Sequence, residues 1–232
     1  MYILGIETTG KYASVSLLDI ESGKILLEKR SGEERSHLKG LIPMIDSLLK
    51  ETGVNKKEIK YIAPSIGPGS FTGIRIGVAT ARALSQGLGI NLIPVPTLDA
   101  FMYKEGLDKS KAVAVIIYAR RGQVYGSVYN DEKYILKPGP YMLTDILEKV
   151  KDFNEVIFLG DGTIYYSLEL NDPRFKIFDD VYQDSKSVVR FAKDNMDKEV
   201  GYNETLPDYM RITEAEAKLN SGELKITKMR QD

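Results

Sequence analysis

The order of predicted elements is the same in both halves of this chain, and it limits the possible folds more than any other feature of the sequence. Each half reads as three strands, a helix, a strand, a second helix and a further strand. Repetition of one order indicates a duplicated structural unit, even where residue identities have diverged. With 232 residues, of which 43% are hydrophobic, the chain is long enough for two lobes with a sizeable core.

In the first half, a three-stranded meander leads into a helix. Its strands are predicted at residues 2–7, 12–19 and 24–30. Ser36 can cap a helix that runs to about Lys50, and Pro43 should kink this helix because proline cannot donate a backbone hydrogen bond. The first half ends with a strand at 61–66, a helix at 71–88 and a strand at 91–95.

The second half repeats this order. Strands are predicted at residues 113–118, at 123–129 and near Tyr134, and Thr144 can cap a helix that ends near Val150. The remaining elements are a strand at 156–159, a helix at 163–170, a strand at 175–178 and a helix at 187–195.

This order is typical of the ribonuclease-H-like unit, and two such units form the actin and sugar-kinase (ASKHA) architecture. We therefore expect an α/β fold of two lobes, each β-β-β-α-β-α-β. The expected division is an N-terminal lobe at residues 1–104, a C-terminal lobe at 105–205 and a partly flexible C-terminal segment at 206–232.

Composition excludes several kinds of site. The chain has no cysteine, so disulfides and thiolate ligands are excluded, and its single histidine, His37, cannot form a histidine-rich metal site. No apolar run approaches the roughly 18 residues of a membrane span, and the first residues lack the basic leader of a signal peptide. We therefore expect a cytoplasmic protein with no cofactor and no membrane contact. The net charge of −1 does not favour nucleic-acid binding by this chain alone, and Arg120 and Arg121 are interpreted as a solvated hairpin tip.

The glycine-rich run at residues 65–77 lies between a predicted strand and a predicted helix, and it allows two interpretations. Glycines at such a turn, here Gly67 and Gly69, let a backbone approach a phosphate closely. The Walker motif, however, needs a lysine after its last glycine, and none follows here. The alternative is close helix packing on the protein's own sheet or on a partner helix. Small or apolar residues share one helix face, namely Gly73, Gly77, Ala81 and Leu84.

A second group of residues would suit a nucleotide. Glu7 ends the first predicted strand and Thr8 follows it, where actin-like ATPases place an acidic residue and a phosphate-binding turn. Asp161 and Gly162 form a candidate second phosphate turn, but the second-half position that corresponds to Glu7 lies near Tyr118 and is not acidic. A stand-alone ATPase or small-molecule kinase, which would bind Mg-nucleotide with the glycine-rich turn and Asp161, therefore stays open as an alternative.

One block is specific enough to indicate a family. Residues 66–77, Ile-Gly-Pro-Gly-Ser-Phe-Thr-Gly-Ile-Arg-Ile-Gly, resemble the signature of the TsaB family, also called YeaZ, whose members are accessory subunits in making threonylcarbamoyladenosine in bacterial tRNA. The chain departs from the family at Tyr118 and Glu7, where aspartate is commoner. Supporting blocks follow in the same order over about residues 2–215: Leu4–Thr9, Arg35–Leu38, Leu41–Ile45, Ala119–Tyr125, Leu159–Gly162 and Pro207–Arg211.

The resemblance also implies what this chain lacks. The catalytic relative TsaD follows the same Gly-Pro-Gly turn with a His-x-x-x-His pair that binds a metal, and Thr97 and Phe101 fall at the corresponding positions here. Phenylalanine cannot bind a metal, and a lone threonine hydroxyl is a poor ligand. The resemblance thus implies a non-catalytic subunit, despite the older glycoprotease name of such proteins.

Support of a catalytic partner is the function that the resemblance implies. Family members act with TsaD and a small ATPase, TsaE, in transferring a threonylcarbamoyl group to N6 of the adenosine next to the anticodon, in tRNAs that read codons beginning with A. Alone, such a chain is expected to form a two-fold homodimer, and tRNA is expected to reach it only through the complex. The partner interface is expected on the two first-lobe helices, at Leu38, Leu41, Ile45, Gly73, Gly77, Ala81 and Leu84.

Overall fold

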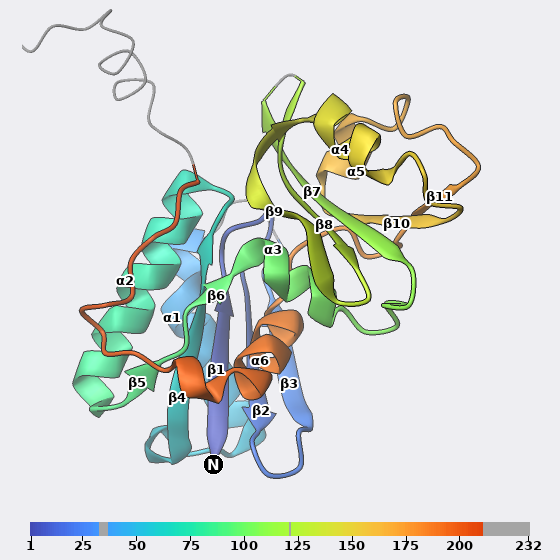
Figure 1. The fold of residues 1–232 in the computed structure, drawn as a ribbon. Helices are drawn as coiled ribbons and strands as arrows, with labels where there is room; N and C mark the ends of the chain where they lie inside the picture. Colours follow the sequence, from blue (N-terminus) through green and yellow to red (C-terminus); the bar gives the residue numbers. More distant parts are fainter. Residues whose placement is uncertain (33–36, 121, 211–232) are drawn as a thin grey trace, which may run out of the picture.

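The computed structural model describes residues 1–32, 37–120 and 122–210, with the side chains of 37–39 left out. Two β-sheets, each with helices packed on it, lie one above the other in Figure 1. The predicted cap Ser36 and the expected flexible segment beyond residue 210 lie outside the described residues.

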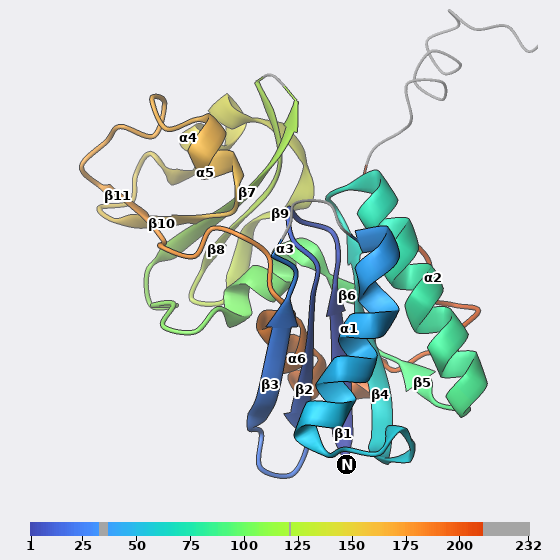
Figure 2. The same ribbon diagram turned by 180° about the vertical axis from the view of Figure 1, so that it is seen from behind.

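The first sheet has the strand order β3-β2-β1-β4-β5. Its strands are β1 (Tyr2–Glu7), β2 (Ser14–Asp19), β3 (Ile25–Arg30), β4 (Ile59–Gly67) and β5 (Asn91–Leu92), and the short β6 (Val95–Pro96) also pairs with β4. The first three strands form an antiparallel meander, whereas β4 runs parallel to β1. Helices α1 (His37–Thr52) and α2 (Phe71–Leu88) cover one face, and α6 (Ser185–Asp194) covers the other (Figures 1 and 2).

The alternating residues of β1 explain why helices cover both faces. Leu4 and Ile6 point to one face and join the core beneath α1 and α2. Ile3 points to the opposite face and packs with Val188 and Val189 of α6. All five side chains are almost fully buried, and a sheet with two apolar faces needs a layer on each side.

The second sheet repeats this arrangement with the strand order β11-β10-β7-β8-β9. Its strands are β7 (Ala112–Arg120), β8 (Gln123–Asn130), β9 (Lys133–Met142), β10 (Val156–Leu159) and β11 (Phe175–Ile177). Helices α4 (Leu143–Val150) and α5 (Gly162–Tyr165) lie against one face. The other face packs on α3 (Thr97–Ala100) and the 3₁₀ helix η2 (Phe101–Tyr103), and this packing joins the lobes. Two further 3₁₀ helices are η1 (Lys56–Glu58) and η3 (Met196–Lys198).

The observed order confirms the expected duplicated α/β fold, because each half runs β-β-β-α-β-α-β. In the two sheets β1 corresponds to β7 and β4 to β10. The expected division at residues 104 and 205 stays a prediction. Helix α6, which that division assigns to the second lobe, packs on β1 and β2 of the first sheet.

Three predicted helices have different limits in the structure. The helix predicted at 163–170 is a single turn, because Tyr166 leaves helical geometry and donates its hydroxyl to the carbonyl oxygen of Arg120 at 2.8 Å. Helix α4 begins at Leu143, so Thr144 is not its cap. Helix α6 begins at Ser185 because the preceding Asp184 caps it, accepting a hydrogen bond from a backbone N–H of its first turn.

Candidate functional site

The glycine-rich turn connects β4 to α2 and depends on conformations that favour glycine. Gly67 and Gly69 have φ values of +120° and +151°, outside the range that most side chains allow. Ser70 then caps α2, since its hydroxyl accepts a hydrogen bond from the N–H of Gly73. The N–H of Ser70 in turn donates to the carbonyl oxygen of Thr9 at 2.7 Å, which fastens the turn to the end of β1.

The space above these glycines is filled by the chain itself. A Cβ atom on Gly67 would lie 2.0 Å from the carbonyl oxygen of Asp208, and one on Gly69 would lie 2.4 Å from that of Thr9. On α2, a Cβ on Gly73 would lie 1.9 Å from the carbonyl oxygen of Thr8. The glycines therefore admit neighbouring backbone, and the phosphate interpretation gains no support from this packing.

The residues expected at the partner interface lie inside the first lobe. Leu41, Ile45 and Ala81 are buried in the core between α1, α2 and the sheet. Gly73 and Gly77 face Thr8, Leu84 packs against the same core, and the side chain of Leu38 lies outside the described part of the chain. The small face of α2 therefore rests on the protein's own sheet, and the expectation that these residues contact a partner stays a prediction.

Four of the candidate nucleotide residues meet at the end of β1. Glu7 is buried, and its Oε1 accepts hydrogen bonds from the N–H and the hydroxyl of Thr9, while Oε2 accepts one from Ser65. Burial raises the pKa of the Glu7 carboxyl above its ordinary value, despite these hydrogen bonds. Thr8 donates its hydroxyl to the carbonyl oxygen of Gly73 at 2.7 Å. The side chains of Glu7 and Thr8 thus bind other groups of the chain, and neighbouring backbone fills the space above Gly67 and Gly69.

Asp161 and Gly162 do not join this cluster, because their described contacts remain in the second lobe. The Asp161 carboxylate accepts a hydrogen bond from the N–H of Tyr118 at 2.9 Å. Burial raises the pKa of Asp161. A Cβ on Gly162 would lie 2.8 Å from the carbonyl oxygen of Ile116 in β7. The described contacts therefore do not link Asp161 to the glycine-rich turn, and a Mg-nucleotide site that combines them stays a prediction.

Thr97 and Phe101 line a small cavity enclosed by the end of β1, α3, η2 and the start of α6. Thr97 is buried, and its hydroxyl lies 3.3 Å from that of Thr9. Phe101 is buried in the core that joins the lobes. The cavity has a volume of about 10 Å³, room for about one water molecule. It is lined by Glu7, Thr97, Ala100, Phe101, Lys104, Gln183, Asp184 and Ser187.

A buried lysine beside this cavity joins the two chain segments that cross between the lobes. Lys104 follows η2, and its Nζ lies 2.6 Å from Oδ2 of both Asp180 and Asp184. Both Asp180 and Asp184 belong to the return segment between β11 and α6. Burial would raise the pKa of Asp184, but the Lys104 ammonium and hydrogen bonds from Ser187 outweigh it and hold the pKa below its ordinary value.

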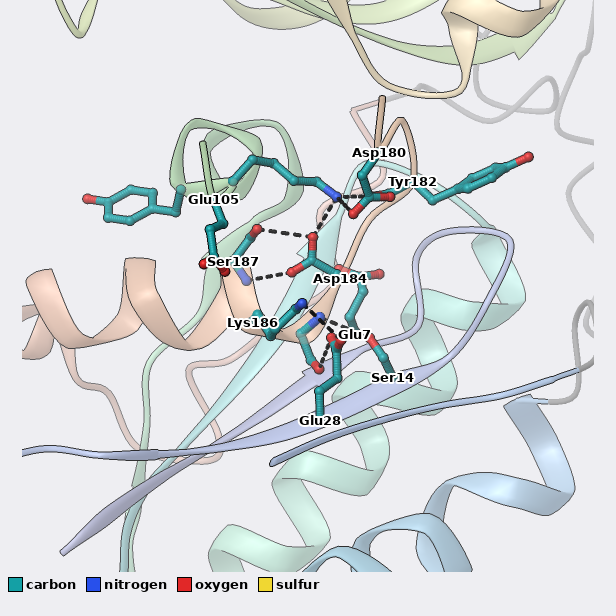
Figure 3. A network of polar contacts seen from close by, with 12 residues as sticks. Glu7, Ser14, Glu28, Glu105, Asp180, Tyr182, Asp184, Lys186 and Ser187 are labelled. Carbon is teal, nitrogen blue, oxygen red and sulfur yellow. Dashed lines mark hydrogen bonds and ion pairs between the residues drawn. The ribbon is translucent and has the colours of Figure 1, made fainter. Parts of the chain in front are cut away.

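The same region fastens α6 to the first sheet. The N–H of Ser185 donates to the hydroxyl of Ser14 at 2.9 Å, and the hydroxyl of Ser16 donates to the carbonyl oxygen of Ser185 at 2.8 Å. Glu28 of β3 accepts a hydrogen bond from the Ser185 hydroxyl and pairs with Lys186 (Figure 3). Sequence reasoning missed this network. The Asp-Ser-Lys-Ser run at 184–187 is a capping signal that could have indicated part of it.

The described residues form neither a metal-binding cluster of acidic, histidine or cysteine side chains nor a membrane-spanning helix. Within residues 1–32, 37–120 and 122–210, no three side chains of His, Cys, Asp or Glu are grouped so that they could hold a metal ion. Among the same residues, no helix is long and apolar enough to cross a membrane.

Comparisons with known proteins agree on one pathway. Residues 31–163 match the family model described as TsaD, tRNA N6-adenosine threonylcarbamoyltransferase. The Bacillus subtilis tRNA threonylcarbamoyladenosine biosynthesis protein TsaB is 29% identical over 226 residues, which cover 94% of this chain and 97% of that relative.

Solved structures show the same fold. YeaZ from Pseudomonas aeruginosa has a TM-score of 0.71 to this chain, and a protein from the same organism with similarity to peptidase YEAZ has one of 0.74. Each is 24% identical and covers 90% of this chain, with 99% of its own length matched.

Proposed function

Because this chain belongs to the TsaB/YeaZ family of tRNA threonylcarbamoyladenosine biosynthesis proteins, we propose that it serves that modification as a non-catalytic subunit. The observation that carries the proposal is the packing of the glycine-rich turn. Gly69 and Gly73 rest on the backbone of Thr9 and Thr8, so the turn that would hold a phosphate in an actin-like enzyme holds the end of β1. A subunit with this packing contributes a surface rather than reacting groups.

The partner is a TsaD-like catalytic subunit, which acts together with a TsaE-like ATPase on the adenosine next to the anticodon. The outer faces of α1 and α2 fit a docking role better than the buried residues expected from the sequence. Ile42 of α1 is 54% exposed and Phe71 of α2 is 46% exposed, a high value for large apolar side chains. Ala79 and Ala83 are exposed one turn apart on α2, and such small residues let a partner helix approach closely.

Without the catalytic subunit, the same outer face is proposed to pair with a second copy in a two-fold homodimer. The proposed location is the cytoplasm, where tRNA is modified. Light scattering of the chain alone and with its partner would give the two stoichiometries.

Co-purification with a TsaD-like subunit tests the interface directly. Ala83→Arg adds one charge at an exposed position, so it should leave the fold intact and weaken the complex at least tenfold. Asn154→Arg adds the same charge at an exposed position of the second lobe, and it should bind like the wild type. Equal binding by both variants would place the interface elsewhere.

Calorimetry with Mg-ATP tests the competing function. The isolated chain is expected to show neither micromolar binding nor turnover. If it showed both, it would be a stand-alone ATPase or kinase, and the non-catalytic role would be abandoned.

Reconstituted threonylcarbamoyladenosine formation should require this chain and should fall with Ala83→Arg in proportion to the lost complex.

A further inference from the structure

The second lobe carries an exposed pair of stacked tyrosines that the proposed function leaves unused. Tyr118 lies in β7 and Tyr165 ends α5, and their ring centroids are 4.0 Å apart with the planes inclined by 21°. Tyr118 is half-buried, whereas Tyr165 is 61% exposed. Since Tyr118 covers one face of the Tyr165 ring, the exposed surface of Tyr165 belongs mainly to its other face and its edge.

Buried groups hold this pair in a fixed position. The backbone N–H of Tyr118 donates to the Asp161 carboxylate, just before α5. Tyr166, next to Tyr165, is buried and donates its hydroxyl to the carbonyl oxygen of Arg120 at 2.8 Å. Both rings are therefore fastened to the end of β7. A surface that is already ordered loses little conformational entropy when it binds a ligand.

A positive charge stands at the same end of β7. Arg120 is exposed, and its Nε donates to Oε1 of Gln123 at 2.5 Å. This amide is neutral, so it orients the guanidinium without neutralising it. The sequence continues with Arg121, which lies outside the described residues. Glu169 is an exposed acid beyond Tyr166 and offsets part of the charge, so ring stacking must supply most of any affinity.

Building on the proposed function, we propose that Tyr118, Tyr165 and Arg120 form a tyrosine platform that binds an unpaired base of RNA. The base would stack on the outer face of Tyr165, and an adjacent phosphate would lie beside Arg120. Proteins recognise unstacked RNA bases by stacking them on aromatic rings, and arginine commonly contacts the backbone phosphate. Ile164 and Leu168 are exposed nearby and would suit an apolar protein partner, so the binding test includes a variant at Leu168.

The platform extends the role of this chain, since tRNA is otherwise expected to reach it only through the complex. Fluorescence anisotropy of the full chain with a labelled RNA stem-loop that has unpaired loop bases would measure the contact. The stem-loop should bind more tightly than a fully paired RNA duplex of the same composition. Tyr165→Ala should weaken stem-loop binding by about tenfold, and Tyr165→Phe should retain it because the ring remains. Arg120→Gln should lower the slope of log affinity against log salt by about one unit.

Leu168→Ala is the matched control, because Leu168 is 87% exposed and supplies neither ring nor charge. It should bind the stem-loop like the wild type. The proposal is overturned if the wild type does not distinguish stem-loop from duplex, or if Tyr165→Ala binds normally. Loss of stem-loop binding in Leu168→Ala would show that the effect does not depend on the ring and would also overturn the proposal. Co-purification with the TsaD-like subunit does not depend on the platform. Absence of RNA binding would therefore leave the proposed function intact, and a failed co-purification would leave the RNA-binding proposal intact.

Discussion

Replacement of Gly73 by alanine tests whether α2 rests on the protein's own sheet. A Cβ at this position would lie 1.9 Å from the carbonyl oxygen of Thr8 and 3.0 Å from its carbonyl carbon. Ordinary van der Waals contact begins near 3.4 Å, so α2 and the end of β1 would have to separate by roughly 1.5 Å in a close-packed region. The atoms in the way are backbone atoms, which cannot rotate aside as a flexible side chain could.

The expected loss of stability follows from three contributions. Alanine in place of glycine favours a helix interior by about 1 kcal/mol. Overpacking costs about 1–3 kcal/mol, and the upper end applies when backbone must move. Separation also breaks the buried hydrogen bond from the Thr8 hydroxyl to the carbonyl oxygen of Gly73, at about 1 kcal/mol. We therefore expect Gly73→Ala to lower the free energy of unfolding by about 2–3 kcal/mol.

Urea unfolding followed by circular dichroism would measure this change, with Gly87→Ala as the matched control. Gly87 lies on the same helix, is exposed and has no atom within 4 Å of a built Cβ, so this variant should gain up to about 1 kcal/mol. If Gly73→Ala were as stable as Gly87→Ala, the small face of α2 would not be in contact with β1. The reasoning that removes Gly73 and Gly77 from the partner interface would then fail.

Two further predictions concern the buried charges. Because burial raises the pKa of Glu7 above its ordinary value of 4.5, the folded state should lose stability as the pH rises from about 4.5 through the folded-state pKa. Glu7→Gln removes this loss, so its stability relative to the wild type should increase across that window in urea titrations, and a pH-independent difference would contradict the assignment. Lys104→Met leaves the buried Asp184 carboxylate without its cation and should cost about 3–5 kcal/mol. Adding Asp184→Asn should restore part of that loss in thermal unfolding, and strictly additive losses would show that the two groups are not coupled.

Most of the fold could be predicted because it depends on short-range patterns. A short apolar run placed β1 at Tyr2–Glu7. Helix α2 has the predicted limits of 71–88, where Ser70 caps its start and the left-handed Gly89 ends it. The third strand of the second half was predicted only near Tyr134, although β9 has 10 residues. Its Gly139 and Pro140 interrupt the strand pattern, and pairing with β8 overrides this weak local preference.

The site was harder to predict because it depends on contacts between distant parts of the chain. The spacing of Gly73, Gly77 and Ala81 showed that they share a face, but spacing cannot tell whether that face meets the same chain or another one. The Lys104 network joins residues about 80 positions apart in sequence, and no local pattern marks a lysine that will be buried. The role of Asp184 as a helix cap could have been predicted, since an aspartate three residues before Ser187 is a capping signal.

Equivalent packing in the second lobe shows what the glycine-rich turn contributes. In the first lobe, Gly73 after β4 rests on Thr8 at the end of β1. In the second lobe, Gly160 and Gly162 after β10 rest on the carbonyl oxygen of Ile116 in β7, with built Cβ distances of 2.1 and 2.8 Å. In the first sheet β4 is the parallel neighbour of β1, and in the second sheet β10 is the parallel neighbour of β7. The same contact therefore recurs at the corresponding place in both units. The second-lobe glycines lie outside the specific signature block at residues 66–77, so this contact does not depend on that block. A glycine block at this turn therefore identifies the fold, and phosphate binding has to be argued from other residues.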